Sequence, residues 1–206
     1  METKLVFLFY YLSIVMCYYC GKLVHAIELP KYRVIKSESD FEIRFYNESS
    51  WMLAPVVSGT SFEQSTKTGF HRLYQYIHGA NLNSTKLAYT APVLTSIPSS
   101  TSIEDRYIVR MYLSSNFEGK LPPQANPELK LQVEKWKTQN IAVRKFSGFA
   151  KDDNIKKEIE GLLGSLKKYL NGSYAKMFED KRSYIIAQYN SSSINYGRLN
   201  EVWITV

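Results

Sequence analysis

The stretch SFEQSTKTGFHRLYQYIHG, residues 61–79, decides the first half of the fold. Its apolar side chains recur at helical spacing and so share one face of a helix. This apolar stripe consists of Phe62, Thr66, Phe70, Leu73, Tyr74 and Ile77. Ser61 is suited to cap the start of the helix, and Gly79 is suited to end it. The pattern predicts an amphipathic helix over residues 61–78.

β-Strands are predicted on both sides of this helix, because alternating or β-branched runs are typical of strands. They cover residues 40–46 and 51–58 before the helix, and 87–97 and 106–114 after it. The same order recurs after the proline-rich turn LPPQANPE. Strands are predicted at 129–136 and 140–147, a helix at 152–170 that Asp152 or Asp153 can cap, and strands at 183–190 and 201–206.

The order of predicted elements therefore indicates an internal duplication. Ser58-Gly59 and Ser147-Gly148 stand at the same place in each half, and with that offset Leu73 falls on Leu162 and Ile77 on Leu166. The helical stripes superpose, as a duplication requires. We predict an α+β fold of two ββαββ halves, about 40–114 and 129–206, that form a distorted antiparallel barrel or twisted sheet with two amphipathic helices.

The first 26 residues have the features of a secretory targeting segment. Residues 5–20 carry no charge, follow Lys4 and end before a small-residue cleavage site at Ala26. Because the apolar run is shorter than the roughly 20 residues of a spanning helix, a cleaved signal peptide is predicted, and an uncleaved anchor is the alternative. The predicted mature chain, residues 27–206, lacks Cys17 and Cys20 and keeps a charge of about +6. No integral membrane association is expected after cleavage.

The sequence also predicts a secreted glycoprotein. Four Asn-X-Ser/Thr sequons lie in polar, turn-like stretches, at Asn47, Asn83, Asn171 and Asn190. An exposed sequon in a secretory protein is an acceptor for N-linked glycans. Asn/Ser-rich loops that are never modified are the alternative.

Composition excludes several classes of function. The chain is 45% apolar, too much for a disordered protein, and its 26 basic residues are interleaved with 19 acidic ones. It has no nucleotide-binding glycine loop and no serine-hydrolase elbow, so neither class is indicated, and nucleic acid is not an expected partner. His71 and His78 lie seven residues apart on one helix, too far to share a zinc ion. No structural metal is predicted.

One flank of the helix stripe suggests a ligand. At helical spacing, Lys67, His71, Tyr74 and His78 border the apolar face. An apolar surface beside a cation suits a flat hydrophobic molecule that carries acidic tails. The body of such a ligand would lie on Phe70, Tyr74 and Ile77. Packing of the stripe against the protein's own sheet is the alternative.

Six motifs now resemble a known family. FEIRFY at 41–46, YIHGAN at 76–81, KLAYTAPV at 86–93, the Pro122-Pro123 turn, FSGFA at 146–150 and NEVW at 200–203 stand in the order seen in SOUL haem-binding proteins. The resemblance spans roughly residues 30–206. With its leader, the chain is similar to the extracellular plant branch of that family.

The resemblance implies non-covalent binding of haem or another tetrapyrrole in an apolar cleft beside the first helix. The family's porphyrin-contact positions fall on Lys67, Phe70 and Tyr74, with Gln75 where the family often has a lysine. Together with Leu73 and Ile77 of the apolar stripe they form the predicted ligand site, in which Lys67 would meet a propionate. One branch places an iron-ligating histidine where this chain has Phe45, which cannot coordinate iron. Binding would then rest on apolar burial and propionate contacts, or on His71 or Tyr74 as a weak iron ligand.

We therefore expect a secreted, non-enzymatic carrier or scavenger of a porphyrin-type small molecule. One alternative is a protein–protein interaction module that uses the same cleft. Another is a tetrapyrrole-modifying enzyme, for which Glu63, His71 and Tyr74 are the candidate acid–base groups.

Overall fold

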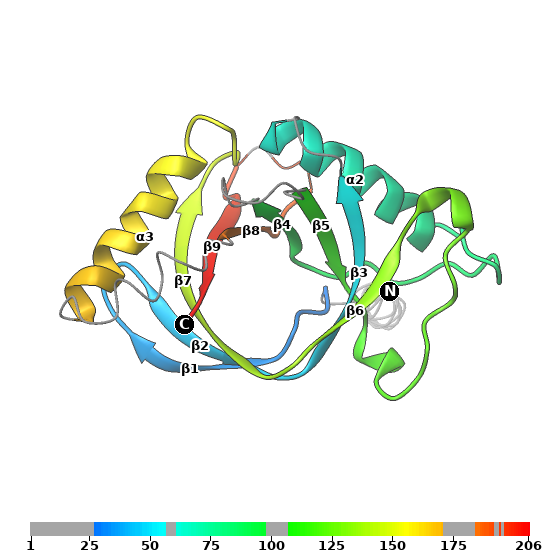
Figure 1. Cartoon of the computed structure of the whole chain (residues 1–206), viewed down its shortest axis with the longest axis horizontal. Coiled ribbons are helices and arrows are strands. Elements are labelled where there is room, and N and C mark those ends of the chain that lie inside the picture. The colour runs from blue at the N-terminus through cyan, green and yellow to red at the C-terminus, as the bar shows by residue number, and fades with distance from the viewer. Residues whose placement is uncertain (1–26, 57–60, 98–106, 171–183, 192–193, 195) are drawn as a thin grey trace, which may run out of the picture.

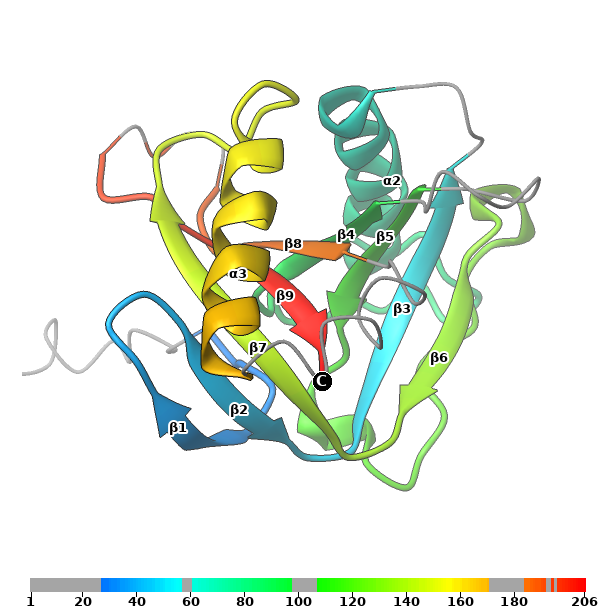
Figure 2. The ribbon, with the colours of Figure 1, turned by 60° about the vertical axis from the view of Figure 1, so that its left-hand side comes forward.

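The structure is a computed structural model, which describes residues 27–56, 61–97, 107–170, 184–191, 194 and 196–206. The predicted leader and the sequon at Asn171 lie outside these residues. The described chain forms one curled sheet with two helices on its outer side (Figures 1 and 2). This arrangement confirms the predicted α+β class.

All nine strands of the described residues join one antiparallel sheet in the order β1-β2-β7-β9-β8-β4-β5-β3-β6. Their bounds are β1 Tyr32–Ser37, β2 Glu42–Tyr46, β3 Ser49–Val56, β4 Val93–Ile97, β5 Tyr107–Tyr112, β6 Gln132–Trp136, β7 Gln139–Ser147, β8 Tyr184–Gln188 and β9 Leu199–Thr205. The helices are α2, Phe62–Ile77, and α3, Ile155–Tyr169; short 3-10 turns span Ser115–Phe117 (η1) and Pro127–Leu129 (η2).

The strand order shows the duplication directly. Strands β2, β3, β4 and β5 of the first half correspond to β6, β7, β8 and β9 of the second. With this correspondence, the order from β2 to β6 is symmetric about its centre, between β8 and β4. The first strands are exchanged between the halves: β2 pairs with β7, and β6 pairs with β3. Two ββαββ halves therefore form one continuous sheet. The sequence did not predict β1, because all six of its side chains are exposed and no buried face marks it.

The two faces of the sheet carry different cores. On the outer face, α2 covers β3, β4 and β5, while α3 covers β7 and β9. On the inner face, side chains of alternating strand residues form an aromatic cluster that includes Trp51, Tyr112 and Trp203. Arg44 and Glu201 lie buried beside it as an ion pair, with 2.9 Å between Arg44 Nη2 and Glu201 Oε1. The inside of the curl is therefore largely filled by side chains.

Close approach of α2 to the sheet depends on Gly69. A Cβ at this position would overlap the side chain of Val109 on β5 and lie 3.3 Å from Cγ2 of Val56 on β3. The missing side chain lets the helix backbone rest directly on β-branched residues of two strands. This contact sets the distance between the α2 backbone and the sheet.

The start of α2 is held by the loop before α3. Ser61 Oγ accepts a hydrogen bond from the Gln64 amide, as predicted. The carboxylate of Asp152 accepts from the amides of Phe62 and Glu63, at 2.7 and 3.2 Å. The prediction that Asp152 or Asp153 caps its own helix was wrong. α3 begins after Asn154, and Asp152 caps the other helix because the two loops meet.

Replacing Asp152 by Ala should lower the free energy of unfolding by about 1–2 kcal/mol, since it leaves two amides of the first turn of α2 without their acceptor. Chemical denaturation would measure the loss. Asp153→Ala is the matched control, because Asp153 is exposed. Equal stability of the two variants would contradict the cross-helix cap.

Candidate functional site: the outward edge of helix α2

The outward edge of α2 carries the side chains that the sequence analysis singled out. Lys67, His71 and Tyr74 are exposed, and Phe70 is half-buried at the border of the core. Tyr74 keeps 40% of its surface exposed, a high value for a large aromatic side chain. The predicted edge is thus accessible, and its residues follow one another at helical spacing.

Four aromatic side chains meet along this edge, and we call them the α2 ring cluster: Phe70, Tyr74, His78 and Tyr89. The rings of Tyr74 and His78 stack with centroids 3.9 Å apart, and the Phe70 ring lies 6.1 Å from that of Tyr74. Tyr89 closes the cluster, with its centroid 5.5 Å from His78 and 6.3 Å from Tyr74. Together they form a partly exposed aromatic surface beside the end of α2.

Hydrogen bonds hold His78 within the cluster. Its Nδ1 lies 2.8 Å from the carbonyl oxygen of Tyr74, so this nitrogen donates. In the neutral ring, Nε2 then accepts from the Tyr89 hydroxyl at 3.2 Å. Burial raises the pKa of Tyr89, and the neighbouring Tyr74 hydroxyl adds to the effect. Tyr89 therefore stays protonated and donates at neutral pH.

Tyr89 was missed as a site residue, although it lies in the KLAYTAPV motif. The chain returns to α2 through a turn that Asn81 organises, with its side chain bonded to the backbone of Tyr76 and Thr85. A β-bridge between His78 and Lys86 then aligns the returning segment with the end of the helix. The motif itself was the available signal, but only this turn places Tyr89 beside Tyr74.

Leu73 and Ile77 lie on the other side of the helix. They are 0% and 3% exposed and belong to the core cluster that includes Met52 and Val109. A cavity of only about 20 Å³ lies near Ile77, lined also by Met52 and Tyr76. Leu73 and Ile77 therefore face the sheet and are not exposed to a ligand on the outward edge. Leu73 and Ile77 support the outward edge from beneath, and the alternative of core packing holds for these two residues.

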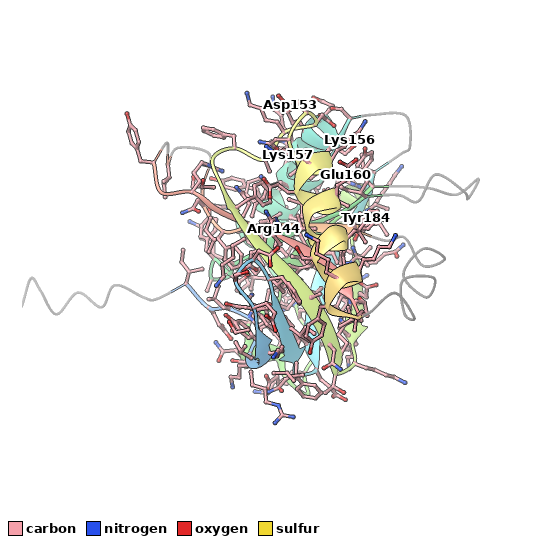
Figure 3. All side chains as sticks on the ribbon, turned by 90° about the vertical axis from the view of Figure 1, so that its left-hand side faces the viewer. Arg144, Asp153, Lys156, Lys157, Glu160 and Tyr184 are labelled. Carbon is pink, nitrogen blue, oxygen red and sulfur yellow. The ribbon has the colours of Figure 1, made fainter. Side chains whose placement is uncertain are left out.

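Helix α3 occupies the equivalent place in the second half but has a different surface. Its outward side carries Lys156, Lys157 and Glu160 (Figure 3). Arg144 from β7 lies against it and pairs with Glu158 at 3.1 Å and Asp40 at 3.3 Å. The outward side of α3 therefore exposes charged groups, whereas the outward edge of α2 exposes aromatic rings. The duplicated fold is thus differentiated at this position.

The candidate iron ligands differ in availability. Both ring nitrogens of His78 are engaged, whereas His71 is exposed and forms no hydrogen bond, ion pair or ring contact in the part of the chain that the structure describes. Phe45, the residue at the family's proposed ligand position, lies on β2 under the guanidinium of Arg33. β7, β9 and β8 separate that strand from the strands beneath α2. Within the described ranges, no three His, Cys, Asp or Glu side chains are grouped to hold a metal.

Glu63, the acid–base candidate, has a local role. Its carboxylate is exposed and accepts a hydrogen bond from the Asp152 amide at 3.2 Å. It thus completes a reciprocal pair with Asp152 at the start of α2. It lies in the first turn, favourable for a carboxylate near a helix N-terminus.

Three sequons fall within the described residues. Asn47 and Asn83 are exposed, while Asn190 is half-buried and its Oδ1 accepts from the Leu199 amide at 2.7 Å. Asn47 and Asn83 therefore project more freely than Asn190.

The described helices include none long and apolar enough to cross a membrane.

The chain is similar to proteins of one known family. The model of the SOUL heme-binding protein family matches residues 27–205. Heme-binding protein 2 of Homo sapiens is 28% identical over 185 residues, covering 87% of this chain and 86% of that protein. Heme-binding protein 1 of Xenopus laevis is 28% identical over 175 residues, covering 82% and 87%. Among solved structures, the EcmrR C-terminal domain aligns with a TM-score of 0.49 and 11% identity, over 84% of this chain and 96% of that chain.

Proposed function

Because the chain belongs to the SOUL haem-binding protein family, we propose that it binds haem or another tetrapyrrole without a covalent bond, on the outward edge of α2. The α2 ring cluster carries this proposal. It is an exposed, preformed aromatic surface with a lysine on the same helix. An exposed patch of this kind is typical of a binding site.

The residues of the edge fit the chemical parts of a porphyrin. Phe70 and Tyr74 offer ring contacts to the macrocycle, while Leu73 and Ile77 hold the helix in place from the core side. Lys67 is exposed one turn before Phe70 and His71 and can reach a propionate carboxylate. The tetrapyrrole supplies the spectroscopic and redox properties, and the protein supplies an apolar, cationic platform.

Binding here does not require an iron bond. Each 100 Å² of buried apolar surface contributes about 2.5 kcal/mol before the cost of association, so a porphyrin can reach about micromolar affinity by burial alone. His71 is the exposed side chain that could add a weak iron contact, and Tyr74 is the second. We therefore expect modest discrimination between haem and metal-free porphyrin.

We further propose that the protein acts as a secreted carrier or scavenger and not as an enzyme. The apolar leader that ends at Ala26 and the sequons at Asn47 and Asn83 support export. The carboxylate of Glu63, one of the acid–base candidates, accepts a hydrogen bond from the Asp152 amide, which supports a capping role for this residue.

Titration of the purified protein with haemin should give a saturable change in the Soret band with a Kd of about 1 μM. Metal-free protoporphyrin IX should bind within about tenfold of haemin, because burial dominates. No saturation by either compound would contradict the proposal. Capture of a protein partner by the same edge would then favour the interaction-module alternative.

The double substitution Phe70→Ala/Tyr74→Ala should weaken haemin binding at least about tenfold, since it removes two rings of the surface. Tyr196→Ala is the matched control, because Tyr196 is 91% exposed and lies outside α2. Thermal unfolding would verify that both variants fold. Unchanged affinity in a folded double variant would exclude this surface as the site.

A further inference from the structure

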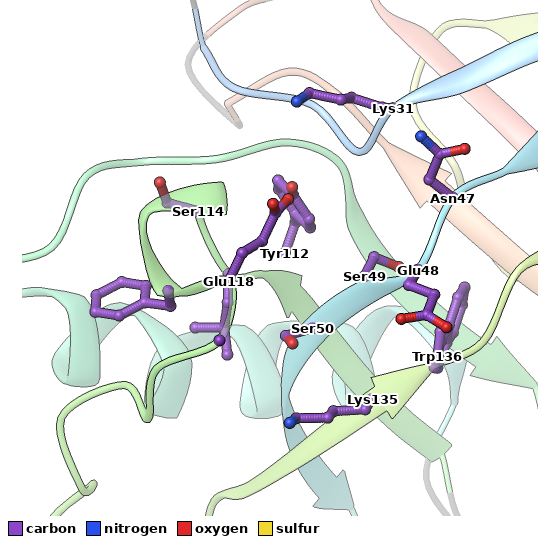
Figure 4. A pocket seen from close by; sticks show the side chains of 13 residues that line it. Lys31, Asn47, Glu48, Ser49, Ser50, Tyr112, Ser114, Glu118, Lys135 and Trp136 are labelled. Atoms are coloured by element: carbon purple, nitrogen blue, oxygen red, sulfur yellow. The ribbon is translucent and has the colours of Figure 1, made fainter.

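A second hollow lies away from the ligand edge of α2. It has a volume of about 380 Å³, and none of its lining residues belongs to α2 or to the α2 ring cluster. The segment before β1, the β2–β3 turn, the starts of β3 and of the loop after β5, and the end of β6 surround it (Figure 4). A pocket of this size is within the range that binds small molecules.

The lining combines rings with many polar groups. Tyr112, Phe117 and Trp136 supply aromatic side chains, and the polar groups come from Asn47, Ser49, Ser50 and Ser114. Lys31 and Lys135 bring two ammonium groups, and Glu48 and Glu118 bring two carboxylates. None of these four charged side chains makes an ion pair with another described residue. Their hydrogen-bonding capacity therefore remains available at the pocket.

The Tyr112 hydroxyl is the most specific feature of the pocket. The residue is only 5% exposed, yet no described residue forms a hydrogen bond with its hydroxyl group. Burial raises its pKa to about 12, and the carboxylates of Glu28 and Glu118 add to the shift, so the group is a donor at neutral pH. Figure 4 shows Tyr112 and the Glu118 side chain close to each other at the pocket. The Tyr112 ring is thus buried, while its hydroxyl lies at the pocket and can donate a hydrogen bond to a polar ligand atom.

The balance of the lining indicates the class of ligand. Two cations and two carboxylates leave no net charge that would select an anion or a cation. Aromatic rings can contact the C–H faces of a sugar ring, while carboxylates, amides and hydroxyls exchange hydrogen bonds with its hydroxyl groups. We propose that this pocket is a binding site for a neutral mono- or disaccharide.

The test uses unglycosylated protein made in bacteria, because the Asn47 side chain lies at the pocket and a glycan there would compete. Ligand-observed NMR and calorimetry would follow titration with cellobiose and N,N′-diacetylchitobiose. Digalacturonate and glycylglycine serve as the anionic and zwitterionic probes. At least one neutral sugar should saturate with a Kd of about 1 mM, and both charged probes should bind at least about tenfold more weakly. No saturation by either neutral sugar, or preference for a charged probe, would overturn the proposal.

Two variants locate the site. Tyr112→Phe keeps the buried ring and removes the hydroxyl, and Glu118→Gln keeps the shape and removes the charge; each should weaken sugar binding about threefold to tenfold. Tyr196→Phe is the control and should bind like the unchanged protein, since Tyr196 is not in the lining. Sugar binding that both pocket variants retain would assign it elsewhere. Haemin titration of the same proteins should be unchanged, so failure here is distinguishable from failure of the tetrapyrrole site.

Discussion

Replacement of Arg44 by Met should lower the free energy of unfolding by about 3–5 kcal/mol, because it breaks a buried ion pair. Both nitrogens at the end of the Arg44 guanidinium donate to the Glu201 carboxylate, at 3.1 and 2.9 Å. The two side chains are only 1% and 2% exposed. Removing the arginine leaves a buried carboxylate without its cation, a far higher cost than removing both charges.

The surroundings of this pair explain why it is a unit. Burial alone would lower the pKa of Arg44, but the hydrogen bonds and charge of Glu201 outweigh it and raise the pKa. Glu201 also accepts from the Tyr189 hydroxyl and from Trp203 Nε1, each at 2.7 Å. Burial, followed by the charge of Glu201, raises the pKa of Tyr189, so this hydroxyl remains a donor. The side chains of Arg44, Tyr189 and Trp203 thus all donate to one carboxylate.

A second substitution tests this account. Arg44→Met/Glu201→Gln should recover about half of the lost stability, because a neutral amide oxygen still accepts from Tyr189 and Trp203. Lys145→Met is the surface control: its ammonium group pairs with Glu42 at 2.9 Å but is half exposed, so its loss should cost less than about 1 kcal/mol. Equilibrium denaturation of the three variants provides the comparison. An Arg44→Met variant as stable as Lys145→Met would refute the buried-pair argument.

Gly69→Ala should destabilise the protein by about 1–3 kcal/mol, although alanine is the better helix former. The added methyl group would overlap the Val109 side chain on β5, which cannot retreat within a packed core. The helix would have to rise from the sheet, and haemin affinity should fall with it, because the ring cluster lies on the same helix.

Gly164→Ala on α3 is the matched control for Gly69→Ala. Nothing lies within 4 Å of a Cβ built at Gly164, so the substitution should stabilise the protein by about 0.5–1 kcal/mol through helix propensity. Thermal and chemical denaturation should therefore show shifts of opposite sign for the same change of residue. Shifts of the same sign in both variants would show that Gly69 is not a close-packing position.

Most secondary structure was predictable because its cause is local. The stripe from Phe62 to Ile77 has helical periodicity, and the structure has α2 at those residues. β1 was not predicted, because all six side chains of Tyr32–Ser37 are exposed and no buried face marks the strand. The cap of α2 by Asp152 was missed for another reason: the partners are far apart in the chain, and Asp152 looked equally suited to its own helix.

The NEVW motif at residues 200–203 was also visible in the sequence, but the partners of its side chains were not. The sequence marked it as a family feature but did not say what the residues do. The structure places Asn200 against the Gly148 carbonyl at 2.8 Å, which joins this motif to FSGFA, and gives Glu201 its buried partner on β2. Strand exchange between the halves brings β2 and β9 to either side of β7.

The amino-acid sequence by itself determined the two amphipathic helices, the repeated order of strands and the family, because periodicity and motif order are properties of neighbouring residues. Only the tertiary structure decided which side of α2 remains open. Leu73 and Ile77 were drawn into the core, because helix and sheet bury their facing apolar side chains against each other, and Tyr89 was added to the edge. The pocket at Tyr112 likewise arises where distant segments meet, so no local pattern could mark it.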